Sequence, residues 1–219
     1  MIAVEGLAMR QGGFALRDIT LRVPAGGYAV LMGATGCGKT SIVEAVCGLR
    51  PITAGCIAVG ARDVTRERPG NRGLGYVPQD GALFSTMTVR EHLAFPLKLR
   101  RWSADAIAAR VAELTAQLAL APLLDRRPHG LRGGERQRVA IGRALSFHPA
   151  ALLLDEPLAS LDETTQDRLR ELLREVHRSA GVTVLHVTHN RAEAEQLATV
   201  RFHLADGKIQ EDDLQTQSA

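Results

Sequence analysis

The sequence predicts an α/β fold: a mixed β-sheet with flanking helices, an antiparallel β region at the N-terminus and an inserted α-helical subdomain. Three observations predict it. Short apolar runs typical of buried strands occur at 28–32, 151–154 and 182–187. A glycine-rich loop at 33–40 joins the first run to a helix pattern, and the segment from about 81 to 149 has helical periodicity. We therefore expect a single domain over 1–219, with a catalytic α/β core at 1–80 and 150–219 and a helical subdomain at 81–149.

The first two thirds of the chain predict strands and then helices. Residues 19–23 alternate with period two, and a Pro/Gly turn at 24–27 precedes the apolar run at 28–32. The helix pattern after the glycine-rich loop ends at Gly48, a typical C-cap. In the middle, Thr88 caps a helix over 89–95 that Pro96 disturbs. Ser103 caps a second helix, whose apolar face carries Ile107, Val111, Leu114 and Leu118.

The last third returns to alternating strands and helices. A strand at 151–154 is followed by a helix that Gly181 ends, and then by a strand at 182–187. Asp206-Gly207 predicts a tight hairpin turn between strands at 200–204 and 208–210. The apolar face of the helix consists of Leu169, Leu172, Leu173 and Val176.

Composition limits the function classes. Hydrophobic residues make up 45% of the 219 residues, enough for a packed core, and no apolar run approaches the roughly 20 residues of a membrane span. The net charge of +3 is too small to predict nucleic-acid binding, and we expect none. The N-terminus has no secretory leader pattern, and three cysteines without C-x-x-C spacing fit a reducing cytosol and no zinc site.

The glycine-rich loop fits G-x-x-x-x-G-K-[ST], the pattern that wraps backbone N–H groups around nucleotide phosphates. Because it lies between a strand and a helix, this P-loop interpretation is preferred to an incidental glycine-rich turn. Lys39 is expected at the β/γ-phosphates, and the Thr40 hydroxyl on Mg²⁺. The predicted ATP- or GTP-binding segment is Gly33, Ala34, Thr35, Gly36, Cys37, Gly38, Lys39, Thr40 and Ser41.

Two adjacent carboxylates end the strand at 151–154. Asp155 is placed to reach the Mg²⁺ shell, and Glu156, on the other side of the strand's alternation, to accept a proton from attacking water. The alternative is a strand end that carries two solvated acids. The P-loop favours catalysis and completes the sequence pattern of a P-loop NTPase core.

Four further polar segments follow this pattern in order. Gln79 ends the segment 76–79, and a Gly-Gly turn at 131–138 leads into a helix. Asp162 follows the carboxylate pair, and His189 ends the last buried strand. With this order and spacing, residues 2 to about 210 resemble the nucleotide-binding subunit of ABC (ATP-binding cassette) transporters.

The resemblance implies a role for each of these segments. Gln79 resembles the Q-loop residue that contacts Mg²⁺ and couples the site to the membrane subunit, and His189 the switch histidine that acts beside Glu156 in catalysis. Asp162 resembles the aspartate of the dimer interface. The residues Arg132, Gly133, Gly134 and Glu135 resemble the signature turn, which contacts ATP bound by the opposite subunit. Taken singly, Gln79 is equally a surface amide and His189 a capped strand-end histidine.

The chain departs from the family pattern in three places. Arg132 stands where the signature usually has serine, which puts closure on ATP in doubt. Gln11 falls where an aromatic ring normally stacks on adenine, so the nearest aromatic, Phe14, is assigned to that role. Asn190 follows His189 where aspartate is common, which leaves the role of the histidine intact.

The resemblance also implies the activity and the partners. We expect a Mg²⁺-dependent ATPase that works as a head-to-tail dimer, with itself or with a paralogous ATPase subunit. It would sit peripherally on the cytoplasmic face of the inner membrane, bound to permease subunits and indirectly served by a periplasmic substrate-binding protein. Residues 77–91 look like bacterial importer subunits, and 183–190 are similar to the molybdate/tungstate oxyanion group.

Three alternatives stay open. They are a mechanical ATPase for lipid or lipoprotein extraction or export, a soluble ATPase of translation or repair, and a module that has lost hydrolysis. The chain stops soon after the final hairpin, so no extra C-terminal regulatory domain is expected. For docking of the permease we expect the apolar residues after Gln79, namely 81–84, Met87 and Phe95, although they are equally suited to the core of the insert.

Overall fold

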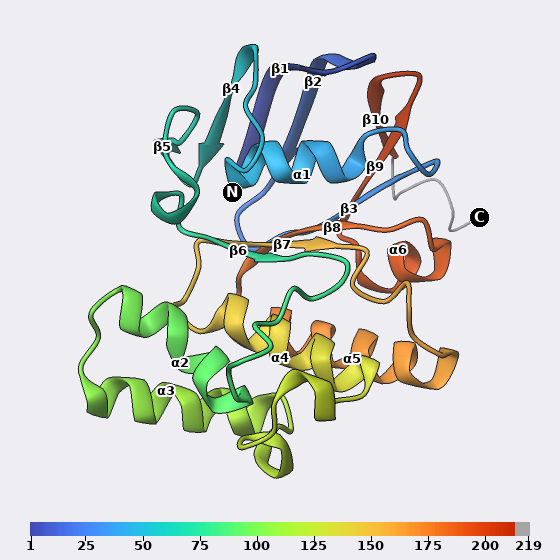
Figure 1. Cartoon of the computed structure of the whole chain (residues 1–219). Helices are drawn as coiled ribbons and strands as arrows, with labels where there is room; N and C mark the ends of the chain where they lie inside the picture. Colours follow the sequence, from blue (N-terminus) through green and yellow to red (C-terminus); the bar gives the residue numbers. More distant parts are fainter. Residues whose placement is uncertain (213–219) are drawn as a thin grey trace.

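The computed structural model describes residues 1–212 as two β-sheets with helices packed on both faces of the larger one (Figure 1). The smaller sheet is antiparallel and has the strand order β2-β1-β4-β5. Its strands are β1 (Ile2–Gln11), β2 (Phe14–Val23), β4 (Ala54–Val59) and β5 (Arg62–Asp63). This is the expected antiparallel N-terminal region.

The larger sheet has the order β10-β9-β3-β8-β7-β6, and only β10 runs antiparallel to its neighbour. All residues of β7 and β8 are buried, because helices or the smaller sheet cover both faces. This explains why these strands are continuous apolar runs rather than alternating ones. The strands are β3 (Tyr28–Gly33), β6 (Leu74–Val77), β7 (Ala151–Asp155), β8 (Thr183–Val187), β9 (Val200–Ala205) and β10 (Lys208–Asp212).

The larger sheet separates two hydrophobic cores. One core lies between the two sheets and includes α1, and the other lies between the larger sheet and α2, α3, α4 and α5 (Figure 1). The helices are α1 (Lys39–Cys47), α2 (Val89–Leu99), α3 (Ala104–Gln117), α4 (Gly133–Leu145), α5 (Glu163–Ala180) and α6 (Arg191–Leu197). Short 3₁₀ turns occur at Pro69–Asn71, Ala121–Leu123 and Pro128–Gly130.

A buried arginine forms hydrogen bonds at the C-terminal end of α1, the helix that follows the phosphate loop. The Arg72 guanidinium donates to the carbonyl oxygens of Ala45 and Val46 at 2.9 and 2.8 Å, and further to those of Thr65 and Glu67. Burial lowers the pKa of Arg72, but its guanidinium gives the Val46 carbonyl oxygen a partner and adds a second hydrogen bond to the Ala45 carbonyl oxygen, which also accepts from the Gly48 N–H. A Cβ at Gly48 would come within 2.5 Å of this guanidinium, so glycine is required at the C-cap.

Most predicted helix ends are present, with one correction. Thr88 forms a capping box with Glu91, and Ser103 caps α3. The helix that Thr88 caps does not stop before Pro96: α2 continues to Leu99, because Leu93 and Leu97 on either side of the proline are fully buried in the core. The turn at Asp206-Gly207 joins β9 and β10 as expected.

Helices α2, α3 and α4 fall within 81–149, and α4 also packs against β6. The division into a catalytic core and a helical subdomain therefore stays a prediction. None of the helices within residues 1–212 combines the length and apolar character needed to cross a membrane.

Candidate functional site

The parallel sheet brings four predicted segments to one edge. Leu31 of β3 pairs with Val187 of β8, which pairs in turn with Asp155 of β7, while Leu154 pairs with Val77 of β6. The carboxyl ends of these strands therefore lie side by side. The phosphate loop, His189, the carboxylate pair and Gln79 all follow directly from them.

The conformation of the loop depends on two glycines. Gly33 has φ +151°, and a Cβ there would lie 2.5 Å from the Leu204 carbonyl oxygen of β9. Gly38 has φ +111° and caps α1, and a Cβ there would lie 2.6 Å from Cζ of Phe14. Neither position accepts a side chain, so the loop packs closely, and no side chain caps the free N–H groups of the first turn of α1.

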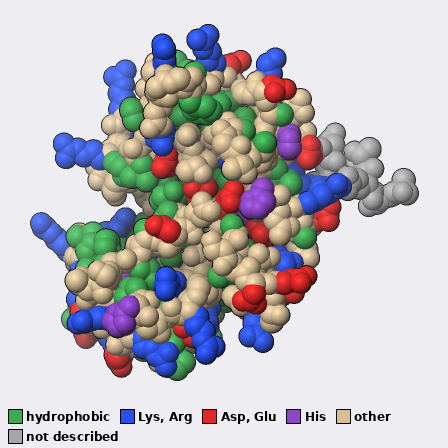
Figure 2. Space-filling view, turned by 45° about the vertical axis from the view of Figure 1, so that its right-hand side comes forward, with side chains coloured by type: hydrophobic (Ala, Val, Ile, Leu, Met, Phe, Trp, Pro, Cys, Tyr) green, Lys and Arg blue, Asp and Glu red, His purple; other side chains and the backbone are tan. Residues whose placement is uncertain are grey.

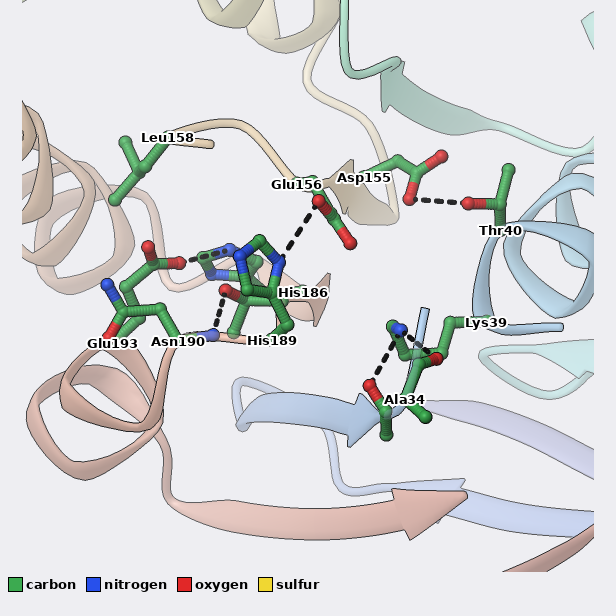
Figure 3. Close-up of polar contacts among 12 residues, drawn as sticks. Ala34, Lys39, Thr40, Asp155, Glu156, Leu158, His186, His189, Asn190 and Glu193 are labelled. Atoms are coloured by element: carbon green, nitrogen blue, oxygen red, sulfur yellow. Dashed lines mark hydrogen bonds and ion pairs between the residues drawn. The ribbon is translucent and has the colours of Figure 1, made fainter. Parts of the chain in front are cut away.

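The loop lysine is held inside its own turn. Lys39 is 5% exposed, and its ammonium donates to the carbonyl oxygens of Gly33 and Ala34 at 2.8 and 2.9 Å (Figure 3). A buried cation that is bonded only to neutral carbonyls is suited to an anion brought to the loop.

Thr40 and Asp155 bring two oxygen atoms together. The Thr40 hydroxyl donates to Oδ1 of Asp155 at 3.0 Å (Figure 3). Burial raises the pKa of Asp155, partly offset by this hydrogen bond. A buried carboxylate beside a hydroxyl, with its charge penalised by desolvation, is a donor set that fits Mg²⁺.

Glu156 and His189 face each other across the strand ends. Glu156 Oε2 lies 3.2 Å from Nδ1 of His189, and the two side chains are 17% and 56% exposed. Glu156 has a positive φ of 45°, unusual for this residue type, and its N–H donates to the Val187 carbonyl oxygen at 2.9 Å. The carboxylate is therefore held at the edge of the sheet with access to water and an imidazole in contact.

Gln79 follows a strand that ends at this edge, whereas the signature turn and Asp162 lie at the starts of α4 and α5. Gln79 is exposed in the segment after β6. The signature turn begins α4 and packs on the start of α5, because a Cβ at Gly133 would lie 2.9 Å from Leu161 and one at Gly134 would lie 2.4 Å from Thr165. Asp162 is the N-cap of α5, and both of its carboxylate oxygens accept hydrogen bonds from Thr165. These bonds lower the pKa of Asp162.

Arg132 changes the chemistry of the signature turn. Its backbone N–H donates to Oε2 of Glu135 at 2.8 Å, which is half of a capping box. A guanidinium has no acceptor, so the other half, in which the side chain accepts from the backbone N–H of Glu135, is chemically unavailable to arginine.

Phe14 lies beside the phosphate loop. It pairs with Gln11 across the β1–β2 hairpin, and its half-buried ring packs against the core between the sheets and against Gly38. Gln11 is exposed. The assignment of Phe14 to adenine stacking stays a prediction.

Sequence reasoning missed two polar groups around the site. One is a buried cluster of Tyr28, His186 and Glu193, in which a histidine inside an otherwise apolar strand was the available signal. The other is Arg143 of α4, whose guanidinium donates to the carbonyl oxygens of Gly81 and Ala82 in the segment after Gln79.

The fold and this edge define a nucleotide-binding domain of the P-loop class. A sequence profile described as ABC transporter matches residues 16–159. The chain belongs to the ABC transporter family.

Relatives and solved structures agree with this assignment. The chain is 43% identical to the sn-glycerol-3-phosphate import ATP-binding protein of Paracoccus denitrificans, over 85% of this chain and 53% of that protein. It is 42% identical to the molybdate/tungstate import ATP-binding protein of Thermococcus kodakarensis, over 95% of this chain and 63% of that protein. The chain thus spans about half to two thirds of these relatives' length. The ATP-binding cassette MJ0796, in a dimeric post-hydrolysis state with ADP and Pi, superposes with a TM-score of 0.85 at 26% identity, covering 98% of this chain and 99% of that one.

Proposed function

We propose that this chain is the ATP-binding subunit of an ABC transporter, which binds and hydrolyses ATP to drive solute import. The observation that carries the proposal is the convergence of a loop lysine, a hydroxyl–carboxylate pair and a carboxylate–imidazole pair at one edge of the sheet. The relatives named above are import proteins, which supports import over mechanical extraction or export.

The residues divide the chemistry among themselves. The loop N–H groups and the N-terminus of α1 bind the phosphates, and Lys39 exchanges its two carbonyl partners for the β/γ-phosphates. Thr40, Asp155 and Gln79 would hold Mg²⁺, which supplies charge neutralisation on the phosphates. Glu156 accepts a proton from the attacking water, and His189 contacts the γ-phosphate.

The site requires a second subunit. The signature turn at 132–135 packs on α5 and serves a nucleotide held by a partner, and Asp162, the N-cap of α5, lies at the dimer interface. A head-to-tail dimer, with itself or with a paralogous subunit, supplies this arrangement. The dimeric state of MJ0796 supports the proposal.

The permease docks on the segment after Gln79, and a periplasmic binding protein delivers the cargo to it. Phe84 is 44% exposed there and stacks on His92, whereas Leu83 packs partly into the core. The docking surface therefore centres on Phe84, and the subunit lies peripherally on the cytoplasmic face of the membrane. The membrane protein that co-purifies with the chain identifies this partner.

Oxyanion import is the narrower proposal for the cargo. It is supported by the molybdate/tungstate relative and by the likeness of residues 183–190. The glycerol-3-phosphate relative is as similar to this chain, so selection of the cargo belongs to the other subunits of the transporter.

Calorimetric titration with Mg²⁺-ATP tests the proposal. Lys39→Ala should abolish measurable ATP binding, because it removes the buried cation of the loop. Lys208→Ala, which removes an exposed lysine on β10, is the matched control and should bind like the wild type. Near-normal affinity in Lys39→Ala would refute the assignment of the phosphate loop.

A further inference from the structure

A buried polar cluster is formed by side chains of β3, β8 and α6, the elements next to the site residues. The Tyr28 hydroxyl and Nδ1 of His186 are 2.9 Å apart, and Nε2 of His186 is 3.3 Å from Oε2 of Glu193. Tyr28, His186 and Glu193 are 1%, 0% and 2% exposed. Within residues 1–212, neither Nε2 of His186 nor Oε2 of Glu193 has a hydrogen-bond partner, so these two buried atoms face only each other, at ion-pair distance.

Burial determines which atoms of this cluster donate a proton and which accept one. Desolvation, with a further contribution from Glu193, raises the pKa of Tyr28 well above its ordinary value, so the hydroxyl keeps its proton. When that proton is donated to Nδ1, the neutral ring carries its own proton on Nε2, which points at the Glu193 carboxylate. The opposite tautomer would set an imidazole lone pair against a carboxylate oxygen at 3.3 Å.

Such a cluster needs an explanation other than stability. Apolar side chains of similar volume usually pack at least as favourably as a buried ionisable pair, because they carry no desolvation penalty. Val184, which shares a face of β8 with His186, is apolar and 1% exposed. The position therefore has an apolar solution that this chain does not use.

The place of the pair in the chain gives that explanation. His186 is the penultimate residue of β8, Glu193 lies in the first turn of α6, and His189 lies in the turn between them (Figure 3). The turn is bonded further by the Asn190 N–H to the Thr188 hydroxyl at 3.0 Å. The contact between His186 and Glu193 joins the two ends of this turn. The Tyr28 hydroxyl contacts His186 from β3, the strand that leads into the phosphate loop.

We propose that Tyr28, His186 and Glu193 are positioning residues that hold the turn so that His189 stays against Glu156. The role rests on the proposed ATP hydrolysis, in which His189 and Glu156 act directly. The three side chains of the cluster are at most 2% exposed, so they act through the turn.

A set of variants in the purified full chain separates positioning from stability. Glu193→Leu leaves the His186 N–H without an acceptor and should lower both stability and kcat. The double variant His186→Phe with Glu193→Leu replaces the pair by apolar groups, so stability should return. Its kcat should stay about ten- to a hundredfold below the wild type with KM for ATP within about twofold, because only the turn is misplaced.

A second measurement needs no turnover. In the nucleotide-free chain, the imidazole NMR signals of His189 in the double variant should move to the positions they take in Glu156→Ala, which lacks the contact. If the wild type itself hydrolyses no ATP, the proposed function fails, while these signals still decide the positioning role.

The result that would overturn the proposal is a folded double variant with wild-type kcat and wild-type His189 signals. If the double variant does not fold, Tyr28→Phe decides instead, since it deletes one oxygen and leaves the ring packing. That variant should lower kcat severalfold at unchanged KM, and a kcat equal to the wild type would refute the role.

Discussion

Two histidine–glutamate pairs of almost equal length lie on either side of the same turn, and they differ in their access to solvent. His189 and Glu156 are 3.2 Å apart, with 56% and 17% of the side chains exposed. His186 and Glu193 are 3.3 Å apart, with 0% and 3% exposed. In the exposed pair, screening by water makes the contact contribute little to stability and leaves both side chains within reach of solvent. In the buried pair, each group depends on the other, so the contact fixes the backbone.

The comparison separates chemistry from positioning. A proton acceptor must meet water, which Glu156 can do at the edge of the sheet. A positioning group must have a single favourable arrangement, which burial gives to His186 and Glu193. Substitutions in the exposed pair should therefore change the rate, and those in the buried pair should change stability first.

The largest expected effect is on the rate in the exposed pair. Glu156→Gln should lower the single-turnover hydrolysis rate by about 10²- to 10⁴-fold, because the amide keeps the shape but accepts no proton. ATP binding should persist, and the trapped nucleotide should hold the dimer closed in light scattering with Mg²⁺-ATP. Glu195→Gln, an exposed glutamate on α6, is the control and should keep the wild-type rate. A wild-type rate in Glu156→Gln would move the base elsewhere, with His189 next.

Stability should show the reverse contrast. His186→Ala leaves a cavity and an unpaired buried carboxylate, so urea unfolding should give a loss of about 3–5 kcal/mol. His189→Ala removes an exposed side chain and should cost less than about 0.5 kcal/mol. Equal losses in the two variants would show that burial does not distinguish the pairs.

The residues at the edge of the sheet could be predicted from sequence because each functional residue comes directly after the apolar run of its own strand. An apolar run followed by Asp155 and Glu156, or by His189, places those side chains at the carboxyl end of a parallel strand. The same local logic located the caps at Thr88 and Ser103.

The buried cluster could not be predicted, since its partners are far apart in the chain. Tyr28 and His186 are separated by 158 positions, and no periodicity in either strand pairs them. Arg143 likewise reaches Gly81 and Ala82 from 62 and 61 positions away. The helix over 89–95 was predicted too short at Pro96. The cost of a proline inside a helix is local, and the buried residues on either side of it hold α2 together.

The smallest expected effect concerns a third histidine, His92 of α2, which is buried like His186 but without a carboxylate at its ring nitrogens. Its Nε2 accepts from the Phe84 N–H at 2.9 Å, and Nδ1 donates to the Thr88 carbonyl oxygen at 2.8 Å. Burial lowers the pKa of His92 from its ordinary value of 6.5, the Thr88 hydrogen bond and Glu91 oppose this, and Arg143 of α4 reinforces it.

The sign of the pH dependence follows from this lowered pKa. Between the folded pKa and 6.5, the unfolded chain binds a proton that the folded chain does not, so stability is full above 6.5 and declines as the pH falls toward the folded value. Wild type should therefore lose more stability than His92→Gln between about pH 7.5 and 5.5, by at most about 1.4 kcal/mol per pH unit. Urea unfolding at both pH values measures this difference. His203→Gln, at an exposed site on β9, should lose as much as the wild type. An equal loss in His92→Gln and wild type would show that burial without a carboxylate partner leaves the pKa of a histidine unchanged.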